Sequence, residues 1–215
     1  MASLTARTAA TLLVLLASCT GHESRAPARE APSADAPVVL FFGDSITAGT
    51  GVDRAAAFPA LVQDRINSEG LDYRCVNAGV AGITTGGSLL RLPEFLRKPP
   101  AVVVVELGAN DVFRRVPSEA WTKNLVEIVE RFQAAGSRVL IAGTLFPPFE
   151  LRYGGAAEAV YRDVARLSSA PLLVDLVAGV AGDPALNVAD GVHPNREGHR
   201  RLAETLWPYL LPLLY

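Results

Sequence analysis

The chain has few residues of the kinds that define several large protein classes. Only two of its 215 residues are cysteines, Cys19 and Cys75, which excludes a disulfide framework and a cysteine-rich metal site. Basic residues number 20 and acidic residues 22, and no basic run occurs, so no nucleic-acid partner is expected. The glycine-containing stretch 43–51 fits neither the dinucleotide-binding spacing nor the P-loop spacing, which excludes those two nucleotide sites.

Long apolar runs are also scarce at the start of the chain. Residues 9–17 are apolar but too few to span a bilayer, and Arg7 precedes them, which is typical of a signal peptide. Residues 16–19, Leu-Ala-Ser-Cys, resemble the lipobox of bacterial lipoproteins, in which cleavage precedes a lipidated cysteine. We therefore expect a signal peptide at 1–18 and a lipid anchor on Cys19 that does not span the membrane. The expected location is the cell envelope, on the periplasmic side of the outer membrane; an ordinary signal peptide is the alternative.

The segment that follows the cysteine has the composition of a tether. Residues 20–36 are rich in Ala, Pro, Ser and charge and lack periodicity, which predicts a disordered linker within 19–36. The folded domain is expected at 37–215. About half of the whole chain is apolar, enough for one substantial core.

Apolar runs then alternate with amphipathic segments. The runs predict five strands, at 38–42, 72–77, 101–107, 138–143 and 171–176. Helical spacing of apolar residues follows each strand, with short turns over 86–96, a helix capped by Ser118, and a last helix after Asn195. We therefore expect an α/β fold, a three-layer α/β/α sandwich with a five-stranded parallel sheet in the flavodoxin-like order 2-1-3-4-5.

Polar residues interrupt the chain where the first and third strands end. Gly43-Asp44-Ser45 follows the first strand and Asn110-Asp111 follows the third, and in the expected order both lie beside one crevice. Taken alone, Asp44-Ser45 is equally typical of a helix N-cap, and Asn110-Asp111 of a turn.

A serine nucleophile needs a base and a group that orients the base. His193 has Asp190 three residues before it, so one loop can let the carboxylate bind one ring nitrogen while the other faces Ser45. His199 lies among Arg and Glu in the last helix and is expected to be solvated. Cys75 is expected to be a buried, unreactive thiol.

Three groups are candidate donors to an oxyanion. They are the backbone N–H of Ser45, the backbone N–H of Gly79 and the side-chain amide of Asn110.

Four segments of the chain resemble, in order, the conserved blocks of the SGNH (GDSL-type) hydrolases. They are Gly43-Asp44-Ser45-Ile46-Thr47, Gly79, Gly108-Ala109-Asn110-Asp111 and Asp190-Gly191-Val192-His193-Pro194. The resemblance covers residues 38–211 and is strongest to the bacterial thioesterase, lysophospholipase and arylesterase branch. It implies Ser45 as nucleophile, Asp190 and His193 as its partners, Gly79 and Asn110 as oxyanion donors, and no metal or organic cofactor. Ile46 and Ala109 depart from the usual Leu and Gly.

These residues predict acyl transfer through an acyl-Ser45 intermediate. The expected substrates are small esters, thioesters or lysophospholipids, and the protein is expected to be a monomer. Activity should rise from acid to mildly alkaline pH, because the base must be neutral and a histidine ordinarily titrates near ~6.5. The acyl chain is expected to contact Val112, Phe113, Phe146 and Phe149, unless these side chains only pack. Alternatives are a carbohydrate O-acetylesterase or acyltransferase and, in another class, a non-catalytic lipoprotein that binds a small molecule.

Overall fold

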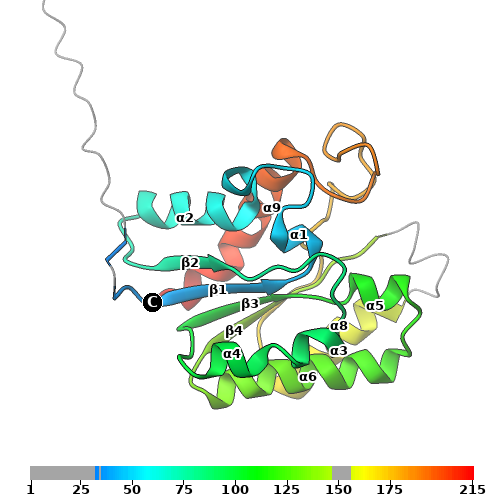
Figure 1. Cartoon of the computed structure of the whole chain (residues 1–215), viewed down its shortest axis with the longest axis horizontal. Helices are drawn as coiled ribbons and strands as arrows, with labels where there is room; N and C mark the ends of the chain where they lie inside the picture. Colours follow the sequence, from blue (N-terminus) through cyan, green and yellow to red (C-terminus); the bar gives the residue numbers. More distant parts are fainter. Residues whose placement is uncertain (1–31, 34, 147–155) are drawn as a thin grey trace, which may run out of the picture.

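A computed structural model describes residues 32–33, 35–146 and 156–215 as a five-stranded parallel sheet covered by helices on both faces (Figure 1). The strand order is β2-β1-β3-β4-β5, so the expected fold and order are confirmed. The strands are β1 (Val38–Gly43), β2 (Arg74–Asn77), β3 (Val102–Glu106), β4 (Arg138–Ala142) and β5 (Leu172–Leu173). The helices are α1 (Ser45–Ala48), η1 (Arg54–Ala56), α2 (Phe58–Ser68), α3 (Thr85–Leu89), α4 (Leu92–Leu96), α5 (Ala109–Phe113), α6 (Ser118–Ala134), α8 (Ala156–Ser168), α9 (Arg196–Leu210) and η2 (Leu211–Leu213).

The apolar run of β1 serves two cores. Successive side chains of a strand point to opposite faces. Val39 and Phe41 therefore pack with α2 and α9 on one face, while Leu40 and Phe42 pack with α6 and α8 on the other. Figure 1 shows these helix pairs on either side of the sheet. A strand buried on both faces has no polar alternation, which is why β1 and β3 were recognisable as continuous apolar runs.

Some local boundaries differ from expectation. Helix α6 begins at Ser118 itself, with Pro117 as the capping position and no side-chain cap, so the expected Ser118 cap is wrong. Strand β5 has only two residues. Cys75 lies half-buried in β2, where burial raises the pKa of its thiol to about 12, consistent with an unreactive side chain.

The described contacts of the domain start before the expected boundary at Pro37. The N–H and hydroxyl of Ser33 donate to the Asp72 carboxylate at 3.1 and 3.0 Å, and Ala36 is buried. The expected signal peptide and Cys19 lie outside the described residues, as does Phe149. No helix within the described ranges has the length and apolarity needed to cross a membrane.

Candidate active site

The nucleophile turn forms where β1 meets β3. Gly43 at the end of β1 pairs in register with Glu106 at the end of β3. A side chain at position 43 would place its Cβ 2.0 Å from Thr47 Oγ1, so this position requires glycine. Ser45 is the first residue of α1, and the Asp44 carboxylate caps the helix by accepting the Ile46 N–H at 3.0 Å. The N-cap and the candidate nucleophile are thus neighbouring residues of one turn, so the two interpretations of the sequence do not compete.

Ser45, His193 and Asp190 lie in contact. The distance from Ser45 Oγ to His193 Nε2 is 2.9 Å, and that from His193 Nδ1 to Asp190 Oδ2 is 2.6 Å. The hydrogen bond from His193 lowers the pKa of Asp190 to about 2, so this carboxyl is ionised at neutral pH and can only accept. His193 therefore carries its proton on Nδ1, which leaves Nε2 free to accept from the Ser45 hydroxyl.

The loop that carries His193 and Asp190 is fixed at both ends. Asp190 Oδ1 accepts the N–H groups of Val192 and His193, each at 2.9 Å, which closes the turn between the two side chains. Behind it, an isolated antiparallel bridge joins Asn187 to Pro194.

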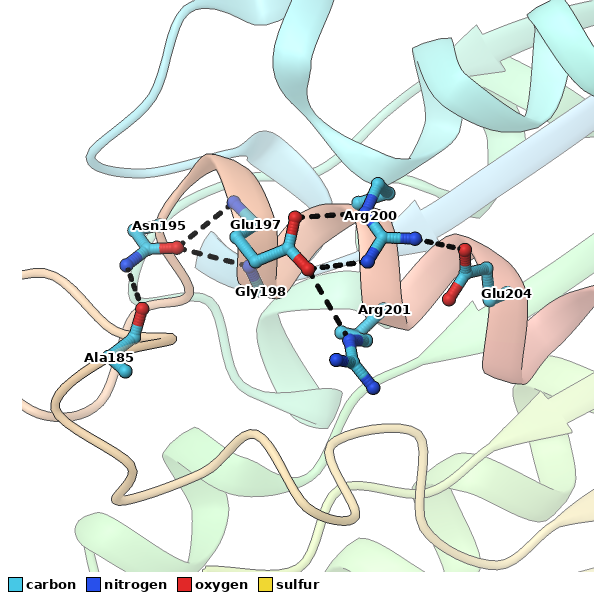
Figure 2. A network of polar contacts seen from close by, with 7 residues as sticks. All are labelled: Ala185, Asn195, Glu197, Gly198, Arg200, Arg201 and Glu204. Carbon is cyan, nitrogen blue, oxygen red and sulfur yellow. Dashed lines mark hydrogen bonds and ion pairs between the residues drawn. The ribbon is translucent and has the colours of Figure 1, made fainter.

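The same loop is attached to the last helix by Asn195 (Figure 2). Asn195 caps α9 through the N–H groups of Glu197 and Gly198 and donates to the Ala185 carbonyl at 2.9 Å. A Cβ at position 198 would come within 2.2 Å of the Leu186 carbonyl, so this close approach requires glycine. The helix and the catalytic loop are therefore held as one unit.

Two of the three expected oxyanion donors lie at the cavity beside Ser45. The Ser45 N–H lies in the first turn of α1 and has no acceptor among the described residues. Asn110 lines the same cavity and donates one amide N–H to Asp44 Oδ2 at 3.0 Å. A primary amide has two N–H groups, so the other remains for a ligand.

Gly79, the third expected donor, is directed elsewhere. Its N–H donates to Asn77 Oδ1 at 3.0 Å, and a Cβ there would lie 2.2 Å from the Ala48 backbone nitrogen. Gly79 thus permits close packing against α1 and does not line the cavity beside Ser45. Gly82 does line it, with φ of 75° and an N–H that no described residue accepts. Both glycines belong to one segment, Gly79-Val80-Ala81-Gly82, and the sequence alone does not indicate which N–H faces the serine.

The cavity beside Ser45 has a volume of about 490 Å³ and a mostly apolar wall. The rings of Phe113 and Phe146 approach with centroids 5.8 Å apart and form part of this wall. Val112 points the other way and packs in the core beneath the opposite face of the sheet, so its expected contact with substrate is wrong. The remaining apolar lining residues are Ile46, Ala81, Ala109 and Val192.

Ala109 shows why the departure from the usual glycine is tolerated. It is the first residue of α5, and the positive φ of this turn, 126°, falls on Gly108 before it. An L-residue is therefore unstrained at position 109.

His199 is fully buried, contrary to expectation. Its Nδ1 accepts the Phe58 N–H at 3.3 Å, and its ring stacks on that of Phe58 with centroids 6.2 Å apart. The charged neighbours that suggested solvent occupy a different face of α9, where Arg200 and Arg201 pair with Glu197 and Arg200 also with Glu204 (Figure 2). His199 shares its face with Leu202 and Leu206 at helical spacing, a signal that the sequence did contain.

The described residues include no group of three or more His, Cys, Asp or Glu side chains placed to hold a metal ion.

The chain matches known hydrolases along most of its length. The model of the GDSL-like lipase/acylhydrolase family matches residues 41–201. The chain belongs to this family. It is 40% identical over 183 residues to esterase TesA of Pseudomonas aeruginosa, covering 84% of this chain and 91% of the relative. It is 33% identical over 184 residues to thioesterase 1/protease 1/lysophospholipase L1 of Escherichia coli K12, covering 85% and 87%.

Solved structures agree with the family assignment. A crystal structure of TesA is similar with a TM-score of 0.78 and 39% identity, covering 82% of this chain and 99% of that one. The protein is an ester hydrolase of the SGNH type, which confirms the expected family, fold and enzyme class.

Proposed function

We propose that this GDSL-like hydrolase cleaves small carboxylic esters and thioesters through an acyl-Ser45 intermediate. The observation that carries the proposal is the chain of two hydrogen bonds from Asp190 through His193 to Ser45 Oγ, at 2.6 and 2.9 Å, opening on an apolar cavity. A hydroxyl activated by an oriented imidazole is the arrangement that acyl transfer requires.

The reaction proceeds in two steps. His193 Nε2 takes the Ser45 proton as Oγ attacks the ester carbonyl, and the imidazolium then protonates the departing alkoxide or thiolate. A water molecule gives its proton to His193 in turn and attacks the acyl-enzyme, which releases the carboxylic acid and restores Ser45. Asp190 stays ionised throughout and stabilises the imidazolium in each step.

Three N–H groups surround the position of the developing oxyanion in this proposal. They belong to Ser45, Gly82 and the Asn110 side chain, with Gly82 taking the role that the sequence suggested for Gly79. Each such donor is worth ~3–4 kcal/mol of transition-state stabilisation, so the set accounts for a large part of the rate.

The apolar wall favours substrates with an acyl or aryl group of modest size. Phe113 and Phe146 provide a surface on which such a group loses contact with water, and each buried methylene adds about 0.8 kcal/mol. The named activities of the two relatives, esterase and thioesterase/lysophospholipase, fall within this range.

Labelling with a fluorophosphonate tests the nucleophile. Wild-type protein should be labelled at Ser45, and Ser45→Ala should lose both the label and hydrolysis of p-nitrophenyl acetate, while Ser118→Ala, at a half-buried serine that begins α6 and does not line the cavity, should retain both. Folded wild-type protein that is neither labelled nor active would identify a binding protein instead and refute the proposal.

A series of p-nitrophenyl esters with acyl chains of increasing length then tests whether the apolar wall binds the acyl group. Phe146→Ala should change the preferred acyl length, because the ring is removed from the cavity and leaves space beyond the carbonyl. An unchanged preference would assign Phe146 to packing alone. Hydrolysis of acetylated sugars in preference to these esters would favour a carbohydrate O-acetylesterase.

We also propose that the protein is exported and lipid-anchored. The support is the sequence pattern of residues 9–19, with Cys19 following a short apolar segment. Metabolic labelling with palmitate in a bacterial host should mark the wild-type chain and not Cys19→Ser. A wild-type chain released unlabelled into the periplasm would show an ordinary signal peptide.

A further inference from the structure

Glu106 is a buried acid that the mechanism above leaves unexplained. It ends β3 directly beside Gly43, has no solvent exposure, and lies under the turn that carries Ser45. No described Arg, Lys or His forms an ion pair with it. A buried charge without a partner costs several kcal/mol of free energy, which favours the neutral form of this carboxyl.

The donors around Glu106 all reach one of its two oxygens. Oε2 accepts the Thr47 hydroxyl at 2.7 Å, the Thr47 N–H at 3.2 Å and the Asp44 N–H at 3.4 Å. Oε1 is fully buried and has no hydrogen-bond partner among the described residues. Because three donors occupy Oε2, the proton of the neutral acid sits on Oε1, and loss of that proton would leave a charged oxygen buried without any donor, which costs more than a buried hydroxyl. Burial and the charge of Asp44 both raise the pKa of Glu106 well above its ordinary value.

Asp44 is the second buried acid of the pair, and its donors are divided between its two oxygens. Oδ1 accepts the Ile46 N–H and Oδ2 accepts the Asn110 amide, each at 3.0 Å. Burial raises the pKa of Asp44 to about 6, and the opposing influences are chiefly the Ile46 N–H, the charge of His193 and the hydrogen bond from the Asn110 amide.

The other ionisable group facing the pair is Tyr161 of α8, whose own pKa is raised by burial and by both acids. Two adjacent buried carboxyls cannot both be ionised cheaply, and Asp44 has donors on both oxygens, so it carries the charge.

We propose that Glu106 is a positioning residue of the active site. Kept as the neutral acid, it holds the Asp44–Thr47 turn that presents Ser45, and it leaves the single negative charge on Asp44, which orients the Asn110 amide. The proposal rests on the proposed function insofar as Ser45 and Asn110 act on the substrate. Neither Glu106 oxygen reaches the cavity, so the residue acts only through its neighbours.

Two conservative substitutions separate shape from charge. Glu106→Gln keeps a carbonyl oxygen for the three donors and replaces the protonated oxygen by an NH₂ group, so its kcat should stay within about threefold of wild type at pH 7. Glu106→Asp keeps the acid but shortens the side chain, so it cannot hold Thr47, and kcat should fall at least about tenfold with KM little changed. A tenfold loss in Glu106→Gln, or full activity in Glu106→Asp, would overturn the proposal; if Glu106→Asp does not fold, Glu106→Gln decides alone.

Urea unfolding at pH 5, 6, 7 and 8 tests the protonation state without relying on activity. If the pKa of a carboxyl is higher in the folded protein than in the unfolded chain, folding becomes less favourable as the pH rises above the pKa of the unfolded chain. The folding constant then falls by up to about tenfold per pH unit. Glu106→Gln lacks this loss, so its folding constant relative to wild type should grow with pH. Glu130→Gln, an exposed acid of α6, should show no such growth. A ratio for Glu106→Gln that is independent of pH would show that Glu106 is ionised and refute the proposal.

The labelling of Ser45 and the unfolding experiment test the proposed function and the role of Glu106 separately. Failure of wild-type labelling at Ser45 would remove the esterase mechanism while leaving the unfolding result intact.

Discussion

The burial of His199 makes the stability of the protein sensitive to acid. Its Nδ1 accepts the Phe58 N–H, so the proton of the neutral ring lies on Nε2, which is buried and has no acceptor among the described residues. A second proton would place a charge between α9 and α2. Burial, and then the charge of His193, therefore lowers the pKa of His199 from 6.5 to about 4.

The sign of the effect follows from proton linkage. Between pH 6.5 and 4 the unfolded chain binds a proton that the folded chain does not, so the stability from neutral His199 is complete above pH 6.5 and is lost as pH falls through 4. At ~1.4 kcal/mol per pH unit the loss is at most about 3 kcal/mol, a large share of the 5–15 kcal/mol typical of a domain.

Urea unfolding of wild type and His199→Gln at pH 7, 5.5 and 4 measures this loss. The glutamine carbonyl can accept the Phe58 N–H but cannot titrate, and the variant loses the ring that stacks on Phe58, so it should be less stable than wild type at pH 7. Only wild type loses the stability of a neutral imidazole in acid, so the difference in unfolding free energy should shrink by about 3 kcal/mol at pH 4. The difference between the two proteins cancels the carboxyls that titrate in both. A gap that is the same at all three pH values would refute the assignment of a neutral, buried imidazole.

Three further predictions concern the catalytic groups and use p-nitrophenyl ester kinetics. Asn110→Ala should lower kcat about 10²–10³-fold with little change in KM, because the amide acts on the transition state; a change in KM alone would contradict this. Asp190→Asn should lower kcat on the order of 10³–10⁴-fold, because an amide no longer fixes the Nδ1–H tautomer of His193, and a loss below tenfold would count against that role. Gly79→Ala should destabilise the fold by forcing the Ala48 backbone away. Gly82→Ala has room for its Cβ, which meets only Arg114 Nη2 at 3.6 Å, but its φ of 75° disfavours alanine, so the variant should fold with a modest loss of stability and lose activity as the N–H turns away from the cavity; the reverse pattern would return the oxyanion role to Gly79.

Sequence reasoning performed best where one physical rule decides the outcome. The runs of β1 and β3 are buried on both faces, so their composition alone predicts central parallel strands, and parallel strands with helical connections leave few possible orders. Strand β5 was harder because only Leu172 and Leu173 pair with β4, and a two-residue ladder depends on tertiary contacts that composition does not encode. The helix boundary at Ser118 failed for a related reason, since Pro117 already supplies the required backbone geometry.

In the candidate site, too, some residues could be predicted from the sequence and others could not. Ser45, Asp190 and His193 are recognisable because their spacing and residue types are demanded by the chemistry, and the structure brings all three into contact. Gly79 and Gly82 are three residues apart in one turn, and only the backbone path decides which N–H faces the serine. Val112 was misplaced because it adjoins Phe113 on α5, where consecutive side chains point in different directions around the helix.

The nucleophile is held in place by groups that no sequence pattern connects with catalysis. Helix α1 has only four residues, far fewer than a helix needs to be stable alone. Its fixed position must come from its surroundings. Glu106 accepts from Thr47 below the turn, and Asn77 donates to the Thr47 carbonyl at 2.7 Å from the end of β2. Since Gly79 binds that same Asn77 side chain, its requirement for glycine belongs to the support of Ser45, and the chemistry of the site therefore depends on three neighbouring strand ends.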